Sequence, residues 1–202
     1  MKKIKALLAS AQPMLIWGFL SFFSDDPIIT PDAKKFLSLT ELPKIEITNF
    51  DVIILDDDLL NYLKQEDHNK TILDNNEVRK IIYAKNKGIG YITKMIKYGT
   101  DGIVSKDSES EEIRKAIIKV KNNGKFFCEN TRAIINKFGE HYELLTPREK
   151  EIFYFLEEGL SNIEISEMIN ISYRTVENHK VSICQKFGLP GRRDLMKYIL
   201  NG

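Results

Sequence analysis

From residue 144 onward, the sequence is divided into short helical segments by residues that begin and end helices. Thr146 is followed by Pro147 and, three positions after the threonine, by Glu149. This is the pattern of a capping box with proline in the first turn. Gly159 then supplies the glycine that commonly follows the end of a helix. No strand pattern appears in this region, so the sequence predicts an all-α domain.

The next two helices are predicted to form a helix-turn-helix. Ser161 and Glu164 repeat the capping pattern, and Ser172 stands where it can cap the helix that follows. The segment between Ile169 and Ser172 has room only for a tight turn. The two helices are therefore expected to meet at a steep angle.

Three stretches at fixed spacing carry a specific resemblance: LTPREKEIF, EGLSNIEISEMINISYRTVENHK and KFGL. Residues 144–202 resemble the DNA-binding domain of the LuxR-type (NarL/FixJ) transcription regulators. The resemblance implies a domain that binds double-stranded DNA as a homodimer at two-fold related half-sites. It also implies that the last helix forms the dimer surface. The residues expected there are Leu195, Met196 and Ile199.

The second helix of the helix-turn-helix supplies the side chains expected to contact DNA. Val176, Ile183 and Phe187 share its apolar face. Of the outward side chains, Asn can read adenine, Glu can accept from cytosine and Val can touch the thymine methyl group. The candidate base readers are Glu177, Asn178 and Val181. The candidates for phosphate contacts, which position without reading sequence, are Arg174, Thr175, Lys180 and Lys186. A helix face that is merely solvated is the alternative.

The charge of this domain is divided along the chain, although the whole protein has a formal net charge of only +1. Residues 146–169 contain two basic and six acidic side chains, whereas residues 172–202 contain six basic and two acidic ones. The positive part therefore coincides with the helix expected to face phosphates. His179 has no cysteine or second histidine at ligand spacing, so no metal site is expected.

The first half of the chain has a different pattern. Short apolar runs, among them IKALLA, KIEI, VIIL, KIIYA and GIVS, alternate with helical segments, which predicts βαβ units. We expect residues 1–121 to form a flavodoxin-like domain with a doubly wound parallel sheet of five strands. Ser108 or Ser110 is expected to cap its last helix. Residues 122–143 are predicted to be a linker with a short helix.

An α/β domain before a LuxR-type domain resembles the receiver of a response regulator, whose phosphoryl acceptor is an aspartate at the end of a strand. Asp56 follows VIIL at that position. Lys106, in GIVSKD, occupies the place of the lysine that precedes the last helix of such receivers. The resemblance therefore implies a receiver-like fold with Asp56 and Lys106 in its pocket.

Other parts of a receiver are missing from the sequence. Ser10 and Ala11 stand where the family has the acids that hold magnesium. Ala84 stands where it has the hydroxyl residue that senses the phosphoryl group. Phosphoryl transfer to a carboxylate needs a divalent ion to neutralise charge on the transferring oxygens. Asp56 is therefore predicted not to be phosphorylated.

The run Asp56–Asp58 is instead interpreted as the acidic end of a strand, paired with Lys106, which stabilises the fold. The leading hypothesis is a sequence-specific transcription regulator with a degenerate receiver, which needs no cofactor and is not an enzyme. Without the phosphoryl signal, either the receiver-like domain dimerises constitutively or a regulatory protein or small molecule controls it. Two alternatives stay open: a conventional regulator switched by phosphorylation of Asp56, and an interaction module with little role on DNA.

The N-terminal segment bears on location and assembly. MKKIKALLASAQ imitates a secretory signal, but its apolar patch is too short. The run from Met14 to Phe23 has about half the length needed to cross a bilayer, so a cytoplasmic protein is expected. Apolar residues surround most of this helix. We therefore predict a contact with a second protein, with Trp17 as a candidate dimer anchor; burial by neighbouring segments is the alternative.

Overall fold

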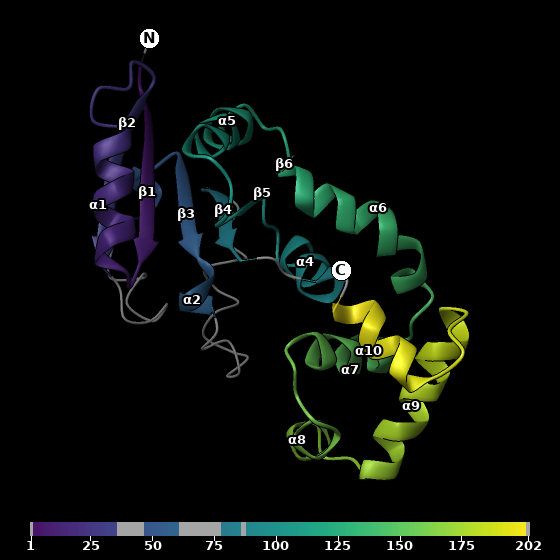
Figure 1. The fold of residues 1–202 in the computed structure, drawn as a ribbon. Coiled ribbons are helices and arrows are strands. Elements are labelled where there is room, and N and C mark those ends of the chain that lie inside the picture. The colour runs from purple at the N-terminus through teal and green to yellow at the C-terminus, as the bar shows by residue number, and fades with distance from the viewer. Residues whose placement is uncertain (1, 36–46, 61–77, 86–87, 201–202) are drawn as a thin grey trace. The chain divides into compact units, whose positions relative to one another are not determined.

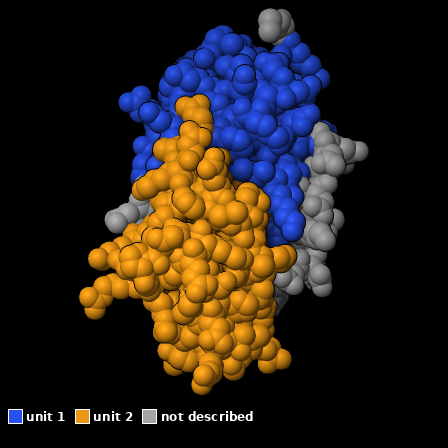
Figure 2. All heavy atoms as spheres, turned by 90° about the vertical axis from the view of Figure 1, so that its right-hand side faces the viewer, with its two compact units in different colours: residues 1–86, 95–131 blue, residues 87–94, 132–202 orange. Residues whose placement is uncertain are grey.

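The chain divides into two units, each described by itself below (Figure 2). The computed structural model describes residues 2–35, 47–60, 78–85 and 88–200. Residues 1–86 and 95–131 form unit 1, and residues 87–94 and 132–202 form unit 2. Among the described helices, none combines the length and the apolar character that a membrane span requires.

Unit 1 is built on one parallel sheet, with six strands among the described residues (Figure 1). The strands are β1 (Ile4–Ser10), β2 (Ile29–Lys35), β3 (Val52–Asp56), β4 (Arg79–Ala84), β5 (Gly102–Ser105) and β6 (Phe126–Phe127). Their order is β2-β1-β3-β4-β5-β6. The predicted parallel α/β fold is confirmed. The predicted number of five strands is wrong, because Phe126 and Phe127 pair with β5.

The strand β2 does not arise from the run KIEI. Residues 44–46 lie outside the described residues, and Ile47 begins the 3₁₀ helix η2 (Ile47–Asn49). The strand β2 lies at the edge of the sheet beside β1. Of its seven residues, Ile29 alone is buried. An edge strand of this kind lacks the apolar pattern that identifies the inner strands in the sequence.

Side chains alternate across the sheet, and both faces of the inner strands are buried. One face packs against α1 (Pro13–Phe22) and α5 (Ser110–Lys121). Buried residues of the other face include Leu7, Ile53, Leu55, Ile82 and Ile103. The carboxyl ends of parallel strands meet at one edge of a sheet, where α/β folds place their sites. Ser10, Asp56 and Ser105 end their strands at this edge.

The other helices that contain residues of unit 1 are α2 (Asp57–Leu60), α4 (Ile89–Lys97) and the start of α6 (Glu129–Glu143). The predicted serine cap of α5 is wrong. Glu109 occupies the N-cap position, and no side chain caps the helix there. Glu111 and Glu112 lie in the first turn instead, where negative charge favours the amino end of a helix.

Unit 2 contains most of α6 together with four shorter helices. These are α7 (Pro147–Glu157), α8 (Asn162–Met168), α9 (Tyr173–Lys186) and α10 (Arg192–Leu200). The predicted caps are confirmed: Thr146 and Ser161 each form a full capping box, and Ser172 accepts a hydrogen bond from the backbone of Thr175. Gly159 follows α7 with a φ of 78°, a left-handed conformation that glycine adopts without steric cost.

Aromatic contacts in the core of unit 2 join α6 to α7 and to α10. Phe138 of α6 stacks edge-on against Tyr198 of α10, with ring centroids 4.6 Å apart. Tyr142 of α6 lies in the same way against Phe153 of α7, at 5.8 Å. The stretch predicted as a linker, residues 122–143, therefore contributes a strand to one unit and most of a helix of fifteen residues to the other.

Candidate nucleic-acid interface and carboxylate cluster

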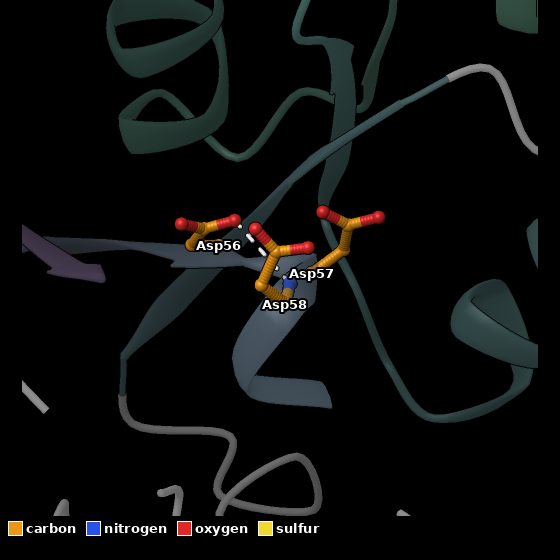
Figure 3. A group of neighbouring side chains, drawn as sticks. All are labelled: Asp56, Asp57 and Asp58. Atoms are coloured by element: carbon orange, nitrogen blue, oxygen red, sulfur yellow. Dashed lines mark hydrogen bonds between the residues drawn. The ribbon is translucent and has the colours of Figure 1, made fainter. Parts of the chain in front are cut away.

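Three consecutive carboxylates lie where β3 ends and α2 begins (Figure 3). Asp56 is fully buried and Asp57 is 3% exposed, whereas the side chain of Asp58 is 46% exposed. The backbone N–H of Asp58 donates to Oδ1 of Asp56 at 3.3 Å. Two of the three acids are thus removed from water and need partners inside the protein.

Lys106, the residue after β5, supplies the counter-charge. Its Nζ lies 2.5 Å from Oδ1 of Asp56, 2.6 Å from Oδ1 of Asp57 and 3.1 Å from Oδ2 of Asp58. Burial by itself lowers the pKa of Lys106, but the hydrogen bonds to the three aspartates outweigh it and raise the pKa. The ammonium group is therefore charged throughout the physiological range.

The neighbouring strands complete the cluster with neutral groups. The Ser10 hydroxyl donates to Oδ2 of Asp56 at 2.5 Å, and the Gln12 amide donates to Asp58. Ala84 contributes its backbone carbonyl, which accepts from the N–H of Lys106 at 2.7 Å. Ala11 is partly exposed beside Ser10. Ser10, Ala11 and Ala84 thus bring no carboxylate to the cluster, and Ala84 brings no side-chain hydroxyl.

The receiver resemblance implies magnesium beside Asp56, and the residues present do not fit that ion. The ligand oxygens of Asp56, Asp57 and Asp58 lie within 4.8 Å of one another, close enough to share a cation. However, the ammonium group of Lys106 already contacts all three. A divalent ion among them would have to displace Lys106 or lie against its positive charge.

On unit 2, the helix α9 presents a stripe of exposed side chains. Arg174, Asn178, Val181 and Gln185 are all exposed. Their spacing of four, three and four residues places them along one side of the helix. The opposite side is buried through Val176, Ile183 and Phe187. The exposed side combines amide, guanidinium and apolar groups, the chemistry that contacts base edges in a groove.

The side chains of four other predicted DNA contacts are bound to neighbouring residues instead of being exposed on this side of α9. Thr175 is half-buried, and its hydroxyl is hydrogen bonded to that of Ser172 at 2.8 Å. Lys180 is buried, and its Nζ donates to Oδ1 of Asn162 at 2.9 Å. Glu177 binds Asn162 and Arg192. Lys186 lies 2.5 Å from Oε2 of Glu149. These side chains bind partners within unit 2.

Glu149 holds α9 against α7, and sequence reasoning found only its capping role. Its carboxylate accepts from Ser182 at 2.6 Å and from Lys186 at 2.5 Å, and it completes the capping box with Thr146. Burial by itself raises the pKa of Glu149, but these hydrogen bonds outweigh it and lower the pKa to about 2. The capping pattern in the sequence revealed Glu149. Its hydrogen bonds to α9 join residues far apart in the chain, so no local pattern could have predicted them.

Comparison with known proteins identifies the domain that carries α9. The family model described as "Bacterial regulatory proteins, luxR family" matches residues 143–199. Residues 143–199 are a LuxR-family domain. The resemblance of the C-terminal region is therefore confirmed.

The similarity also extends over the rest of the chain. Transcriptional regulatory protein MctR of Rhizobium johnstonii is 26% identical over 204 residues, covering 98% of this chain and 94% of that protein. Nitrate/nitrite response regulator protein NarP of Escherichia coli is 28% identical over 194 residues, covering 93% and 90%. The fold is shared with RcsB from Salmonella enterica serovar Typhimurium, solved bound to promoter P1flhDC with the phosphomimetic BeF3−. That structure gives a TM-score of 0.61 at 20% identity and covers 98% of both chains.

The residues predicted for the dimer surface of the LuxR-family domain differ in their exposure. Leu195 is fully buried, so its side chain belongs to the core and is withdrawn from the predicted surface. Met196 and Ile199 are partly exposed on α10. In unit 1, Trp17 is 72% exposed on α1, and Met14, three residues earlier on the same helix, is 78% exposed. The predicted anchor Trp17 is therefore exposed on α1.

Proposed function

We propose that the protein is a transcription regulator that binds a specific DNA sequence through α9 of its LuxR-family domain. The exposed stripe on α9 carries this proposal, because Arg174, Asn178 and Val181 are free to meet bases or phosphates. Two relatives that are similar over at least 90% of their length, a transcriptional regulatory protein and a response regulator, agree with it. The RcsB structure bound to a promoter offers a template for the fold on DNA.

The regulator works without aspartyl phosphorylation under this proposal. Lys106 neutralises part of the charge on Asp56, Asp57 and Asp58 from within the chain. An ammonium group cannot offer the open coordination positions with which magnesium aligns a phosphoryl group. Ala84 has no hydroxyl to bind such a group. A regulatory protein or small molecule bound to unit 1 is then the source of control.

The protein binds DNA as a homodimer under this proposal. Helix-turn-helix dimers read two half-sites about one helical turn apart, so their operators repeat with two-fold symmetry. Trp17, exposed on α1 together with Met14, is the proposed anchor in unit 1. Met196 and Ile199 contribute on the LuxR-family domain. Both surfaces belong to a single chain, so two copies can pair through identical patches.

Binding of the full-length protein to duplex DNA tests the first part. We expect randomised duplexes to yield an inverted repeat that binds with an affinity that falls as salt rises. Arg174→Ala should weaken binding at least tenfold. Arg132→Ala, which removes another exposed arginine, on α6, should leave binding unchanged. Equal weakening by both variants, or no selected sequence at all, would support an interaction module instead.

Incubation with acetyl phosphate and magnesium tests the second part. We expect the intact mass to stay unchanged and the affinity for the selected duplex to remain the same in wild type and Asp56→Asn. A phosphoryl group on Asp56, together with a change in affinity that Asp56→Asn abolishes, would establish a conventional phosphorylation switch. Binding to BeF3− with magnesium provides an independent readout of the same pocket.

A further inference from the structure

Two of the side chains expected to meet DNA form a network inside unit 2. We infer that Glu177 and Lys180 position α9 and that Asn178 and Val181 select bases, so that the half-site has adjacent A·T pairs. This inference rests on the proposed function and states which residues read the sequence. Glu177, which the sequence suggested as a base reader, is here assigned a positioning role instead.

Asn162, the first residue of α8, is the centre of the network. Its Nδ2 donates to Oε1 of Glu177. Its Oδ1 accepts from Nζ of Lys180 at 2.9 Å. Arg192, the first residue of α10, forms an ion pair with Oε2 of the same glutamate. One amide therefore fixes two residues of α9, and the glutamate ties α8, α9 and α10 together.

The network leaves neither charged group of α9 available. The side chains of Glu177 and Lys180 are 14% and 11% exposed. Both carboxylate oxygens of Glu177 have partners, so reading a cytosine would break bonds to two other helices. Burial lowers the pKa of Lys180, and a buried ammonium directed at Asn162 cannot also reach a phosphate. Breaking the network to contact DNA would leave charged groups without partners.

The exposed stripe has the composition of an A·T reader. The side-chain amide of Asn178 can donate to N7 of adenine and at the same time accept from its N6 amino group. Val181, 39% exposed, is suited to the methyl group of thymine. Three residues of helix rise about 4.5 Å, close to the spacing of about 3.4 Å between neighbouring base pairs. Asn178 and Val181 are therefore close enough to reach neighbouring pairs, with Arg174 one turn nearer the start of α9.

Selection of randomised duplexes by the full-length protein tests the assignment. We expect A·T pairs at two adjacent positions of each half-site in the wild type. Asn178→Ala and Val181→Ala should each lose about tenfold discrimination at one of these positions. Glu177→Gln and Glu177→Ala should keep every base preference while lowering affinity for all duplexes by the same factor. The loss should be smaller for Glu177→Gln, whose amide oxygen can still accept from Asn162.

Circular dichroism shows whether each variant is folded before binding is compared. Lys180→Gln is the second positioning variant, because its amide can still donate to Asn162, and it should behave like Glu177→Gln. A loss of preference at a single base pair in either Glu177 variant would overturn the assignment and make the glutamate a reader. A wild-type protein that selects no sequence would refute the proposed function itself. The two failures are therefore distinct.

Discussion

Replacing Lys106 by methionine should destabilise unit 1 strongly, and by an amount that depends on pH. Methionine keeps most of the side chain's bulk and removes the ammonium group that contacts Asp56, Asp57 and Asp58. Two of these carboxylates are then buried without a cation. Leaving buried charges unpaired in this way typically costs about 3–5 kcal/mol.

Protonation of an aspartate sets the upper limit of this cost. Protonating an aspartate whose ordinary pKa is near 4 costs about 4 kcal/mol of free energy at pH 7, because each pH unit above the pKa adds about 1.4 kcal/mol. At pH 5 the same protonation costs about 1.5 kcal/mol. We therefore expect Lys106→Met to lose about 3–4 kcal/mol at pH 7 and less than half as much at pH 5. The variant should thus become relatively more stable as pH falls.

The free energy of unfolding can be measured by urea denaturation followed by circular dichroism, with calorimetry to separate the transitions of the two units. A loss of about 3 kcal/mol should lower the melting temperature of unit 1 by about 10 °C. Lys121→Met is the matched control: Lys121 Nζ lies 2.5 Å from Asp51, but the two side chains are 41% and 26% exposed. Such a surface pair is worth less than about 1 kcal/mol.

A second substitution checks the cause. Asp57→Asn in the Lys106→Met background removes one buried carboxylate and should recover part of the lost stability, although it would destabilise the wild type. If Lys106→Met unfolds within about 0.5 kcal/mol of the wild type at pH 7, with the same pH profile, the cluster does not depend on its ammonium group. The interpretation of Asp56–Asp58 as a charge-compensated strand end would then be wrong.

Three further substitutions test charges and surfaces elsewhere. Glu149 has a pKa of about 2, so it stabilises unit 2 above about pH 4.5 and loses this effect as pH falls toward 2; Glu149→Gln should cost about 3 kcal/mol at pH 7 and flatten that acid profile in urea melts. Burial raises the pKa of Glu157 to about 7 despite a hydrogen bond from Gly90, also in unit 2. The free energy of unfolding of the wild type should therefore fall as pH rises from about 4.5 to 7. Glu157→Gln cannot ionise, so its melting temperature should be higher than that of the wild type at pH 8. Trp17→Ser should weaken self-association in sedimentation velocity, and an unchanged dimer would exclude α1 from the interface.

The sequence predicted unit 2 well because its signals act over short distances. A capping box such as Thr146 with Glu149 closes within three residues, and Gly159 ends the same helix through its own backbone conformation. Such contacts depend little on the rest of the fold. The same reasoning failed for α5, where two serines lie near the start of the helix and neither side chain caps it.

The parts of unit 1 that sequence reasoning missed depend on pairing between distant segments. The strand β6 has only two residues, and it exists because its backbone meets β5. The strand β2 is an edge strand with mostly exposed side chains, so no apolar run announces it. The inner strands β1, β3, β4 and β5 were visible because burial on both faces requires continuous apolar runs.

At both candidate sites, the structure changes which of the predicted side chains are available, because several of them bind neighbours within their own unit. At the carboxylate cluster, the pairing of Asp56 with Lys106 is present, but the lysine also binds the two following acids. On α9, Glu177 has the chemistry of a base reader, yet Arg192, fifteen positions further on, forms an ion pair with it. A sequence shows which groups a residue carries. Whether those groups are free depends on tertiary neighbours.

This distinction explains why the stability of the carboxylate cluster, Asp56–Asp58 with Lys106, should not depend on magnesium. A divalent ion arrives from solution and leaves when its concentration falls, whereas Lys106 is covalently attached and is always present beside Asp56. A single ammonium charge leaves the three carboxylates with a net negative charge, which repels an incoming phosphoryl donor. Magnesium would have to displace Lys106, which already contacts all three carboxylates. Neither magnesium nor acetyl phosphate should therefore change the stability of unit 1. In Lys106→Met the cation is gone, and magnesium should raise the melting temperature because it can then occupy the space between the carboxylates.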